Sequence, residues 1–473
     1  MRLIDATRLH PLKNHLKYGC DPDNAIHRRE KVDVKPLLKS RLKYRILTPF
    51  AEAGRWPTTI FVPTSMNRVT MVGSSNNVNT PRTGSKAANQ GVDSRYTYQQ
   101  TSRYFAQVAE GLEAMSAGEL SSLGATDVHM GYRGFFFHAD RATLYRITYQ
   151  SRFIQKIVAP LSFFDCHSTK YLYRRAKEIG WTELLRLDKT FAIVSNVSNS
   201  TIRHSKYAAL CVKDAIIDSF KEQFDRRPNI DTKQPDVWLN LHITKDRATI
   251  GLEVSGGSLH KRGYRIETHK APMQETLAAA ITDLSEWAGE RPWVDPMCGS
   301  GTLLCEALMR YCQIPAGYLR RQFGFEALHD FDAQIWNVVK READAALRPL
   351  PAGLIAGSDI SAQAIDAARV NLAQLPYGPE VDLKQIDFRD IKSLGNRTIV
   401  ANPPHGLRLQ KREGLDLFCK DLGDFLKQRC TGSTAYLYFG DRDLIKRIGL
   451  RTTWKIPLAS GGVDGRLVKL ELY

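Results

Sequence analysis

The stretch that decides the fold runs from Trp293 to Leu304 and reads WVDPMCGSGTLL. It predicts a buried strand that ends at Asp295, a tight Gly-Ser-Gly loop and a helix that begins near Thr302. Glycines let the backbone approach a ligand closely, and the free N–H groups of a helix N-terminus attract an anion. In an open α/β sheet such a loop lies at the carboxyl ends of the strands, where ligands bind.

The residues around the loop narrow the choice of ligand. A dinucleotide fingerprint needs Gly or Ala where this chain has Leu304, and a P-loop needs a Gly-Lys-Ser/Thr run that is missing here. Asp295 would repel a pyrophosphate but suits an ammonium group. The methionine part of S-adenosylmethionine carries both an ammonium and a carboxylate, so it fits both features. A glycine turn that serves packing alone is the alternative.

Two later acids favour the same ligand. Asp359 ends the expected strand LIAGSD, where a carboxylate can accept hydrogen bonds from ribose hydroxyls. Asp387 ends the expected strand VDLKQID, where an acid can accept from the adenine amino group. Either acid alone could cap the helix that follows it. Together, at successive strand ends, they describe one ligand that lies across the sheet.

A second loop predicts the chemistry. Ile399 to Leu409 reads IVANPPHGLRL, and Asn402, Pro403 and Pro404 follow an apolar strand. The prolines stiffen the loop. An Asn side-chain oxygen and the Pro403 carbonyl can accept both hydrogens of an exocyclic base amine and align its nitrogen for attack. His405 can stack on an extruded base.

Strands and helices alternate through this region, which predicts a doubly wound parallel sheet. The segment from Tyr311 to Pro351 reads as an insertion between the first two strands of this sheet. The expected strands are 293–296, 354–359, 381–387, 398–402 and 434–439, and the expected helices are 302–312, 361–375 and 415–428.

The residues before this sheet predict two smaller α+β units. In the first, we expect a strand at 104–108, a helix at 111–123, a strand at 128–138 and a helix at 141–161, which makes a β-α-β-α order. In the second, we expect helices at 171–179 and 205–224, a strand at 190–197 and a hairpin of 237–243 with 249–254.

The N-terminal part differs from the rest in charge and composition. The chain has 473 residues and a net charge of +17, and Met1–Arg103 holds 18 Lys and Arg against 7 Asp and Glu, which leaves 49 against 43 for the remainder. Ser65 to Arg103 is rich in Ser, Thr, Asn and Gly, so we expect residues 1–103 to be a basic, disordered extension. The basic total points toward a polyanion.

Several runs, taken in order, resemble one known family. SGGSLHKRGYR (Ser255 to Arg265), APMQETLAAAI (Ala271 to Ile281), DPMCGSGTLL and ANPP are similar to the bacterial 23S rRNA guanine-N2 methyltransferases that carry a THUMP domain. The resemblance extends from about Tyr104 to Tyr473. It implies a ferredoxin-like part at 104–165, a THUMP RNA-binding region at 166–262 and a Rossmann-like, S-adenosylmethionine-dependent methyltransferase domain at 263–473.

The resemblance, the two loops and the local clusters of basic residues together assign roles to individual residues. The Ala271–Leu277 segment would cover the methionine end of the cofactor. The catalytic residues would be Asn402, Pro403, Pro404 and His405. The cofactor contacts would be Asp295, Pro296, Cys298, Gly299, Gly301, Thr302, Asp359, Asp387 and Asn402. The predicted RNA contacts are Arg203, Lys206, His260, Lys261, Arg262 and Arg265. The family usually has Tyr and an acid where this chain has His405 and Leu407, which bears on substrate choice and rate.

The sequence leaves three functions open. The first is methylation of a guanine N2 in 23S rRNA, and the second is the same chemistry on tRNA guanine or on adenine N6 in DNA. The third is an RNA-binding assembly factor that has lost methyl transfer. The eight cysteines form no C-x-x-C pair, so we expect no metal. No apolar run is long enough for a membrane helix, and no signal peptide is visible, so we expect a cytoplasmic protein.

Overall fold

A computed structural model describes residues 95–268, 272–404, 412–460 and 463–473. These residues belong to one of two compact units of the chain, Ala87–Tyr473. Residues 1–94 of the predicted disordered extension and His405 lie outside the described residues. The prediction was wrong for residues 95–103, because they form α1 (Thr97–Thr101) and the first residue of β1 (Arg103–Val108) and bury the Tyr96 and Tyr98 side chains in the core. Within the described ranges, no helix combines the length and the apolar content that a membrane span needs.

The first part of the chain has the order of a ferredoxin-like fold. Its elements are α1 (Thr97–Thr101), β1 (Arg103–Val108), α2 (Glu113–Ser122), β2 (Thr126–Gly131), β3 (Gly134–His138), α3 (Arg141–Gln150) and β4 (Ile154–Asp165). Two predictions were wrong here. The expected strand at 128–138 is a hairpin that turns at Arg133, whose φ is 55°. The expected helix at 141–161 ends at Gln150, because Ser151 adopts extended backbone and the apolar run after it pairs with β1.

The next elements extend the same sheet. They are α4 (Thr169–Lys177), α5 (Trp181–Leu184), β5 (Thr190–Ser198), α6 (Ser205–Phe224), β6 (Asn229–Ile230), β7 (Val237–Thr244) and β8 (Arg247–Glu253). The strand order is β2-β3-β1-β4-β8-β7-β5-β6, so one eight-stranded sheet joins the two predicted α+β units through the β4–β8 pair. The expected helix at 205–224 is confirmed with the same bounds.

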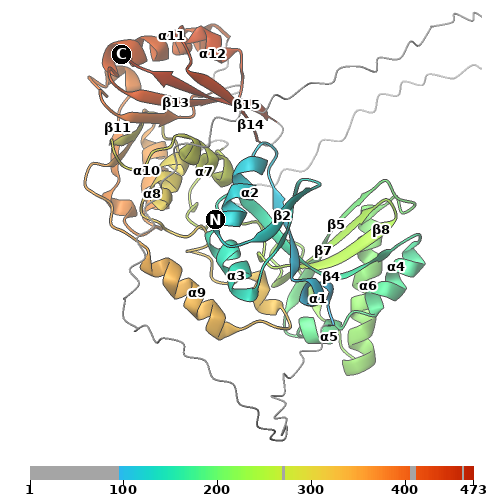
Figure 1. Ribbon diagram of the computed structural model, residues 1–473. Helices are drawn as coiled ribbons and strands as arrows, with labels where there is room; N and C mark the ends of the chain where they lie inside the picture. The colour runs from blue at the N-terminus through green and yellow to red at the C-terminus, as the bar shows by residue number, and fades with distance from the viewer. Residues whose placement is uncertain (1–94, 269–271, 405–411, 461–462) are drawn as a thin grey trace, which may run out of the picture. The chain divides into compact units, whose positions relative to one another are not determined.

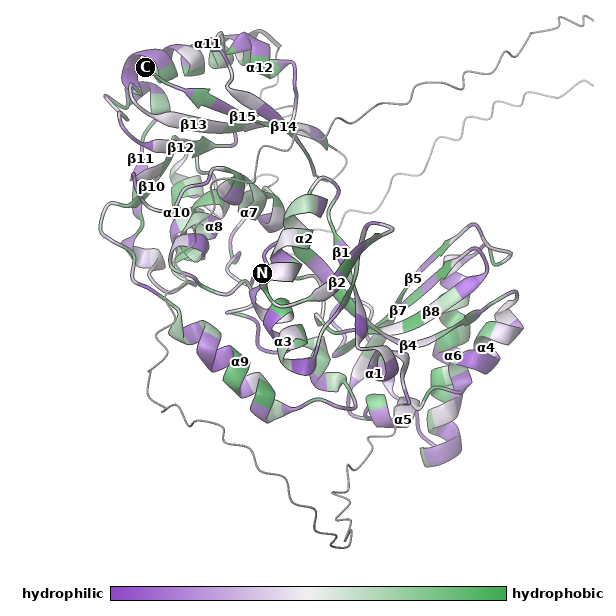
Figure 2. Cartoon of the chain, in the orientation of Figure 1, coloured by the Kyte–Doolittle hydropathy of each residue, from purple (hydrophilic) through white to green (hydrophobic). Residues whose placement is uncertain are grey.

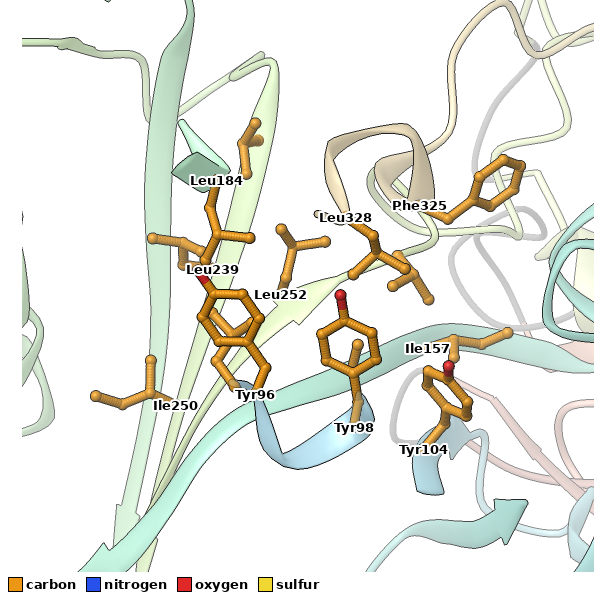
Figure 3. Packing of buried hydrophobic residues seen from close by; sticks show 14 of the residues in the cluster. Tyr96, Tyr98, Tyr104, Ile157, Leu184, Leu239, Ile250, Leu252, Phe325 and Leu328 are labelled. Atoms are coloured by element: carbon orange, nitrogen blue, oxygen red, sulfur yellow. The ribbon is translucent and has the colours of Figure 1, made fainter. Parts of the chain in front are cut away.

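The predicted insertion, residues 311–351, lies between β9 (Trp293–Asp295) and β10 (Ile355–Asp359), which belong to a second sheet. It packs onto the core of the first sheet. It holds the short helix η1 (Gly324–Ala327) and helix α9 (Ala333–Ala345). Phe325 and Leu328 join the same buried cluster as Tyr98 and Leu252, as Figure 3 shows. Figure 2 shows that α9 carries both polar and apolar residues, and its buried residues are Val339 and Ala343. The insertion therefore ties the two sheets together.

The second sheet has seven strands in the order β11-β10-β9-β12-β13-β15-β14. Its elements are α7 (Glu275–Leu284), β9 (Trp293–Asp295), α8 (Thr302–Tyr311), β10 (Ile355–Asp359), α10 (Ala362–Leu372), η2 (Gly378–Glu380), β11 (Asp382–Gln385), η3 (Phe388–Asp390), β12 (Thr398–Ala401), α11 (Arg412–Arg429), β13 (Thr434–Phe439), α12 (Leu444–Arg447), β14 (Trp454–Ser460) and β15 (Val463–Glu471).

Helices cover both faces of this sheet, as the predicted doubly wound fold requires (Figure 1). One apolar cluster joins α7, α8 and α10 to Trp293, and a separate one joins α11 and α12 to its neighbour Val294. The five predicted strands, β9 to β13, are parallel as expected. Two strands that were not predicted, β14 and β15, add an antiparallel edge beside β13. The strand order reverses between β9 and β12, which are adjacent and parallel. The glycine loop and the Asn-Pro-Pro loop therefore leave neighbouring strands at the same edge.

Candidate active site

The glycine loop is held in place by the next strand. Gly299 and Gly301 have φ of 55° and 80°, a left-handed backbone that favours glycine. The Gly299 N–H donates to Asp359 Oδ2 at 2.9 Å, and the other oxygen of Asp359 accepts from the Ser361 N–H at 3.0 Å. A Cβ added at Gly299 would meet no atom within 4 Å. The loop therefore leaves open space above a backbone that can approach a ligand.

Asp295 lies at the end of β9 and is 1% exposed. Its Oδ1 accepts from the Met297 N–H at 3.1 Å. Burial, followed by a smaller effect of the charge on Asp359, raises the pKa of Asp295 to about 8, although the Met297 bond opposes this. A buried carboxyl group with a raised pKa is suited to receive a cation, because the cation would restore its ionised form.

A hollow opens beside these groups. The lining residues are Pro272, Met273, Asp295, Met297, Cys298, Gly299, Ser300, Thr302, Leu303 and Asn402. Five of the nine predicted cofactor contacts are among them. Burial raises the pKa of the Cys298 thiol, so this side chain is a neutral wall and not a nucleophile.

The other four predicted contacts, Pro296, Gly301, Asp359 and Asp387, lie outside this lining. Pro296 is buried, and Gly301 caps α8, where a Cβ would come within 3.1 Å of the Ala368 Cβ. Asp387 Oδ2 is ion-paired with Arg389 Nη1 at 3.0 Å, so a ligand amine would share this carboxylate with a guanidinium. A carboxylate has about four acceptor positions. Asp359 and Asp387 therefore both keep acceptor capacity for further donors.

Asn402 brings the second loop to the hollow. It follows β12 directly, and its Oδ1 is buried without a hydrogen-bond partner among the described residues. A buried polar atom without a partner carries a cost of about 1–3 kcal/mol. Such a cost is expected where a ligand supplies the missing donor. The structure therefore brings together the glycine loop, Asp295 and an open acceptor, as the sequence predicted.

One predicted RNA contact points inward. The Arg262 side chain is completely buried, with Nε 3.3 Å from Glu306 Oε1, Nη1 donating to the Leu259 carbonyl and Nη2 donating to the Arg152 carbonyl. Arg152 Nη2 donates to the other oxygen of Glu306 at 3.0 Å, and the Tyr264 hydroxyl lies 3.2 Å from Oε1. The prediction that Arg262 contacts RNA was wrong, because all its surroundings are protein.

Arg265 and His260 also do not fit the predicted role. Arg265 is 16% exposed and donates to the Met273 carbonyl and the Thr302 hydroxyl, so it lies behind the residues that line the hollow and not on an RNA surface. Burial, and then the nearby arginines and lysine, lower the pKa of His260 to about 4. His260 is therefore neutral near pH 7 and cannot attract phosphate by charge. Arg203, Lys206 and Lys261 are exposed, and their RNA contacts stay predictions.

Sequence reasoning missed part of the lining and the cluster behind it. Met297, Ser300 and Leu303 fall inside the quoted motif but were not named, whereas Pro272 and Met273 lie in the segment that the resemblance assigned to the methionine end. Glu306 had no signal of its own, because its partners are 44 and 154 residues away. Among the described residues, no group of three or more His, Cys, Asp or Glu side chains is placed to hold a metal ion.

Comparison with known proteins agrees with this geometry. The family models that match are the RlmL ferredoxin-like domain at 103–158, the THUMP domain at 166–253 and the RMKL-like methyltransferase domain at 262–469. A Synechocystis sp. protein named as an RNA methyltransferase (slr0064) is 38% identical over 374 residues, which cover 79% of this chain and 97% of that protein. The ribosomal RNA large subunit methyltransferase K/L of Syntrophotalea carbinolica is 35% identical over 383 residues, which cover 78% of this chain and 53% of that protein.

Solved structures give the same picture. SMU.472, named as a methyltransferase and solved in complex with SAH, has a TM-score of 0.69 at 27% identity, covering 79% of this chain and 98% of that one. A Listeria monocytogenes protein named as a predicted N6-adenine-specific DNA methylase has a TM-score of 0.67 at 27% identity, covering 79% and 97%.

The fold and the hollow at its strand reversal define a Rossmann-like methyltransferase, a class whose cofactor is S-adenosylmethionine. Within that class, the chain belongs to the THUMP-domain RNA methyltransferase family of which the K/L enzymes are members. It spans nearly all of the Synechocystis relative and about half the length of the K/L proteins that it matches. The resemblance seen in the sequence is confirmed at the level of the family.

Proposed function

We propose that this protein transfers a methyl group from S-adenosylmethionine to the N2 amine of a guanine in 23S rRNA. The observation that carries the proposal is the buried, unpartnered Oδ1 of Asn402, which lines the same hollow as Asp295 and Gly299. An exocyclic amine is a poor nucleophile and offers two hydrogens, so it needs acceptors that orient it more than it needs a strong base. The names of the K/L relatives support the choice of rRNA.

The residues of the hollow fit the cofactor. Asp295 would hold its ammonium, and the backbone of the glycine loop would lie against the methionine part. Asp359 and Asp387 would accept from the ribose hydroxyls and the adenine amine. When bound, the cofactor supplies an electrophilic methyl group on a sulfonium. Asn402 Oδ1 and the Pro403 carbonyl would accept the two amine hydrogens, which turns the nitrogen lone pair toward the hollow.

The RNA would be held by exposed cations outside the hollow. Arg203 and Lys206, at the start of α6, and Lys261, in the segment after β8, are exposed. We infer that they contact phosphates, which fixes the position of the RNA without reading its sequence. Asn402 Oδ1 would accept from an adenine amine as well as from a guanine amine, and recovery of the methylated nucleoside distinguishes the two targets.

The test is methyl transfer from labelled S-adenosylmethionine to protein-free 23S rRNA, 16S rRNA and tRNA, each from cells that lack the enzyme. We expect label in 23S rRNA, recovered as N2-methylguanosine after digestion. Label in tRNA alone would overturn the substrate, and labelled N6-methyladenosine would overturn the target atom. Binding of cofactor without label in any RNA would favour an assembly factor that has lost methyl transfer.

Variants at Asn402 test the chemical role within the same assay. Asn402→Ala removes the acceptor, and we expect the transfer rate to fall about 10²- to 10³-fold, as when one preorganised polar group is lost. Binding of S-adenosylhomocysteine should change by only a few fold. Asn337→Ala, an Asn→Ala change on the exposed face of α9, is the matched control. An active Asn402→Ala enzyme would contradict the proposed role.

A further inference from the structure

Arg265 connects two walls of the hollow. Its Nη2 donates to the Met273 carbonyl at 2.7 Å and to the Thr302 Oγ1 at 3.2 Å. Met273 stands just before α7, Thr302 is the first residue of α8, and both line the hollow. A single guanidinium therefore sets the spacing between the starts of two helices that lie on the same face of the sheet.

The placement of this cation costs stability. Helix N-termini carry partial positive charge, so a cation beside the first turns of α7 and α8 opposes both helix dipoles. Glu275, in the first turn of α7, offsets this, with Oε1 3.0 Å from Arg265 Nε, although that N–H is not directed at the oxygen. The two side chains are 16% and 8% exposed, so both charges are largely removed from water. A buried ion pair adds little net stability over a well-packed apolar pair.

Because the ion pair of Arg265 adds little net stability, the bridge that Arg265 makes between two walls of the hollow is better explained by a role in the site. We propose that Arg265 is a positioning residue for the cofactor, acting through the Met273 carbonyl and the Thr302 hydroxyl. It fixes the width of the hollow where the methionine end is expected to lie, and it does not itself line the hollow. This inference rests on the proposed function, because it requires that the hollow binds S-adenosylmethionine.

The first test is calorimetric binding of S-adenosylhomocysteine to the full-length Arg265→Gln variant. We expect the dissociation constant to rise about ten- to hundredfold, the range expected for the loss of a hydrogen bond to a charged group. The KM for S-adenosylmethionine should rise in parallel, while kcat at saturating cofactor and the dissociation constant for RNA should change less than threefold. Arg265→Lys, which keeps the charge but reaches only one acceptor, should recover part of the affinity.

Thr302→Val gives a second variant that keeps the side-chain volume and removes the acceptor. If Arg265 acts through Thr302, the double variant should lose little more affinity than Arg265→Gln alone. Fully additive losses would overturn the inference. This variant also keeps the proposal testable if Arg265→Gln fails to fold, since Thr302→Val alone should weaken binding while Arg265 keeps its bond to Met273.

Arg310→Gln is the matched control, since Arg310 lies on α8, the helix that begins at Thr302, and is paired with Asp283 of α7 at 3.4 Å. It should lower thermal stability without weakening the binding of S-adenosylhomocysteine. If Arg265→Gln behaves like this control, Arg265 is only structural and the inference fails. If RNA affinity falls and cofactor affinity does not, Arg265 contacts RNA instead. If the wild-type protein does not bind S-adenosylhomocysteine, the proposed function itself fails.

Discussion

Asp295→Asn should stabilise the cofactor-free protein and weaken its binding of cofactor. The pKa of Asp295 is raised from 3.8 to about 8, mainly by burial. The folded protein therefore holds the Asp295 proton more tightly than the unfolded chain does. The free energy of unfolding is highest below pH 3.8 and falls progressively until the pH has risen through 8. At pH 7 the loss is on the order of 4 kcal/mol, taken at about 1.4 kcal/mol per pH unit. Asn cannot ionise, and its Oδ1 can still accept from the Met297 N–H.

The same carboxyl predicts the pH dependence of cofactor binding. If only ionised Asp295 holds the cofactor ammonium, the binding-competent fraction is about a hundredth at pH 6 and about a tenth at pH 7, and the apparent dissociation constant scales inversely with this fraction. Affinity should rise about tenfold between these two values. It should fall again above about pH 8, where a free α-ammonium loses its own proton.

Two measurements check these expectations for wild type and Asp295→Asn. Urea unfolding of the cofactor-free proteins at pH 5 and pH 8 should show a stability difference that favours the variant and grows with pH. Calorimetry with S-adenosylhomocysteine from pH 6 to pH 8 should show a steep profile for wild type and weak binding with a flat profile for the variant. Parallel unfolding and binding profiles for the two proteins would refute the reasoning, since Asp295 would then not be the titrating group.

Three further predictions follow from named contacts. Glu306→Gln leaves Arg262 buried without a counter-charge, so the urea midpoint should correspond to a loss of about 3–5 kcal/mol, and an unchanged midpoint would contradict the buried pairing. Gly301→Ala forces a side chain onto a φ of 80° and to within 3.1 Å of the Ala368 Cβ, so thermal melting should show about 1–3 kcal/mol of destabilisation and calorimetry weaker cofactor binding. Lys206→Glu should weaken RNA binding, and the slope of the logarithm of the binding constant against the logarithm of the salt concentration should become shallower by about one. The affinity for the cofactor should not change and serves as the control.

The parts that the sequence predicted well depend on short-range signals. The turn from β9 into α8 is fixed by Gly299 and Gly301, and the strand before it by its apolar residues. The Asn-Pro-Pro run marks the end of β12 in the same way. Because both loops leave parallel strands, their proximity followed from the expected sheet alone.

The errors arose at segments whose local sequence pattern fits a helix as well as a strand. The residues from Ile154 to Asp165 are apolar enough to read as the end of a helix, but they form the strand that joins both halves of the first sheet. What decides between the two is pairing with β8, about ninety residues later in the chain. The antiparallel edge strands β14 and β15 were also missed, although β15 pairs with β14, the strand directly before it in the chain, as well as with β13.

The arginines after β8 show the limit of reading charge from composition. Arg262 and Arg265 looked like an RNA-binding cluster because both stand in a short basic loop. Each has an acid partner at Glu306 or Glu275, and both acids lie on helices beside the hollow, in the domain that follows. Two arginines of the basic run therefore attach the segment after the THUMP domain to α7 and α8, the helices beside the hollow. Only exposed cations such as Lys261 can contribute to binding a polyanion, so the salt dependence of RNA binding should report fewer ions than the sequence of this loop suggests.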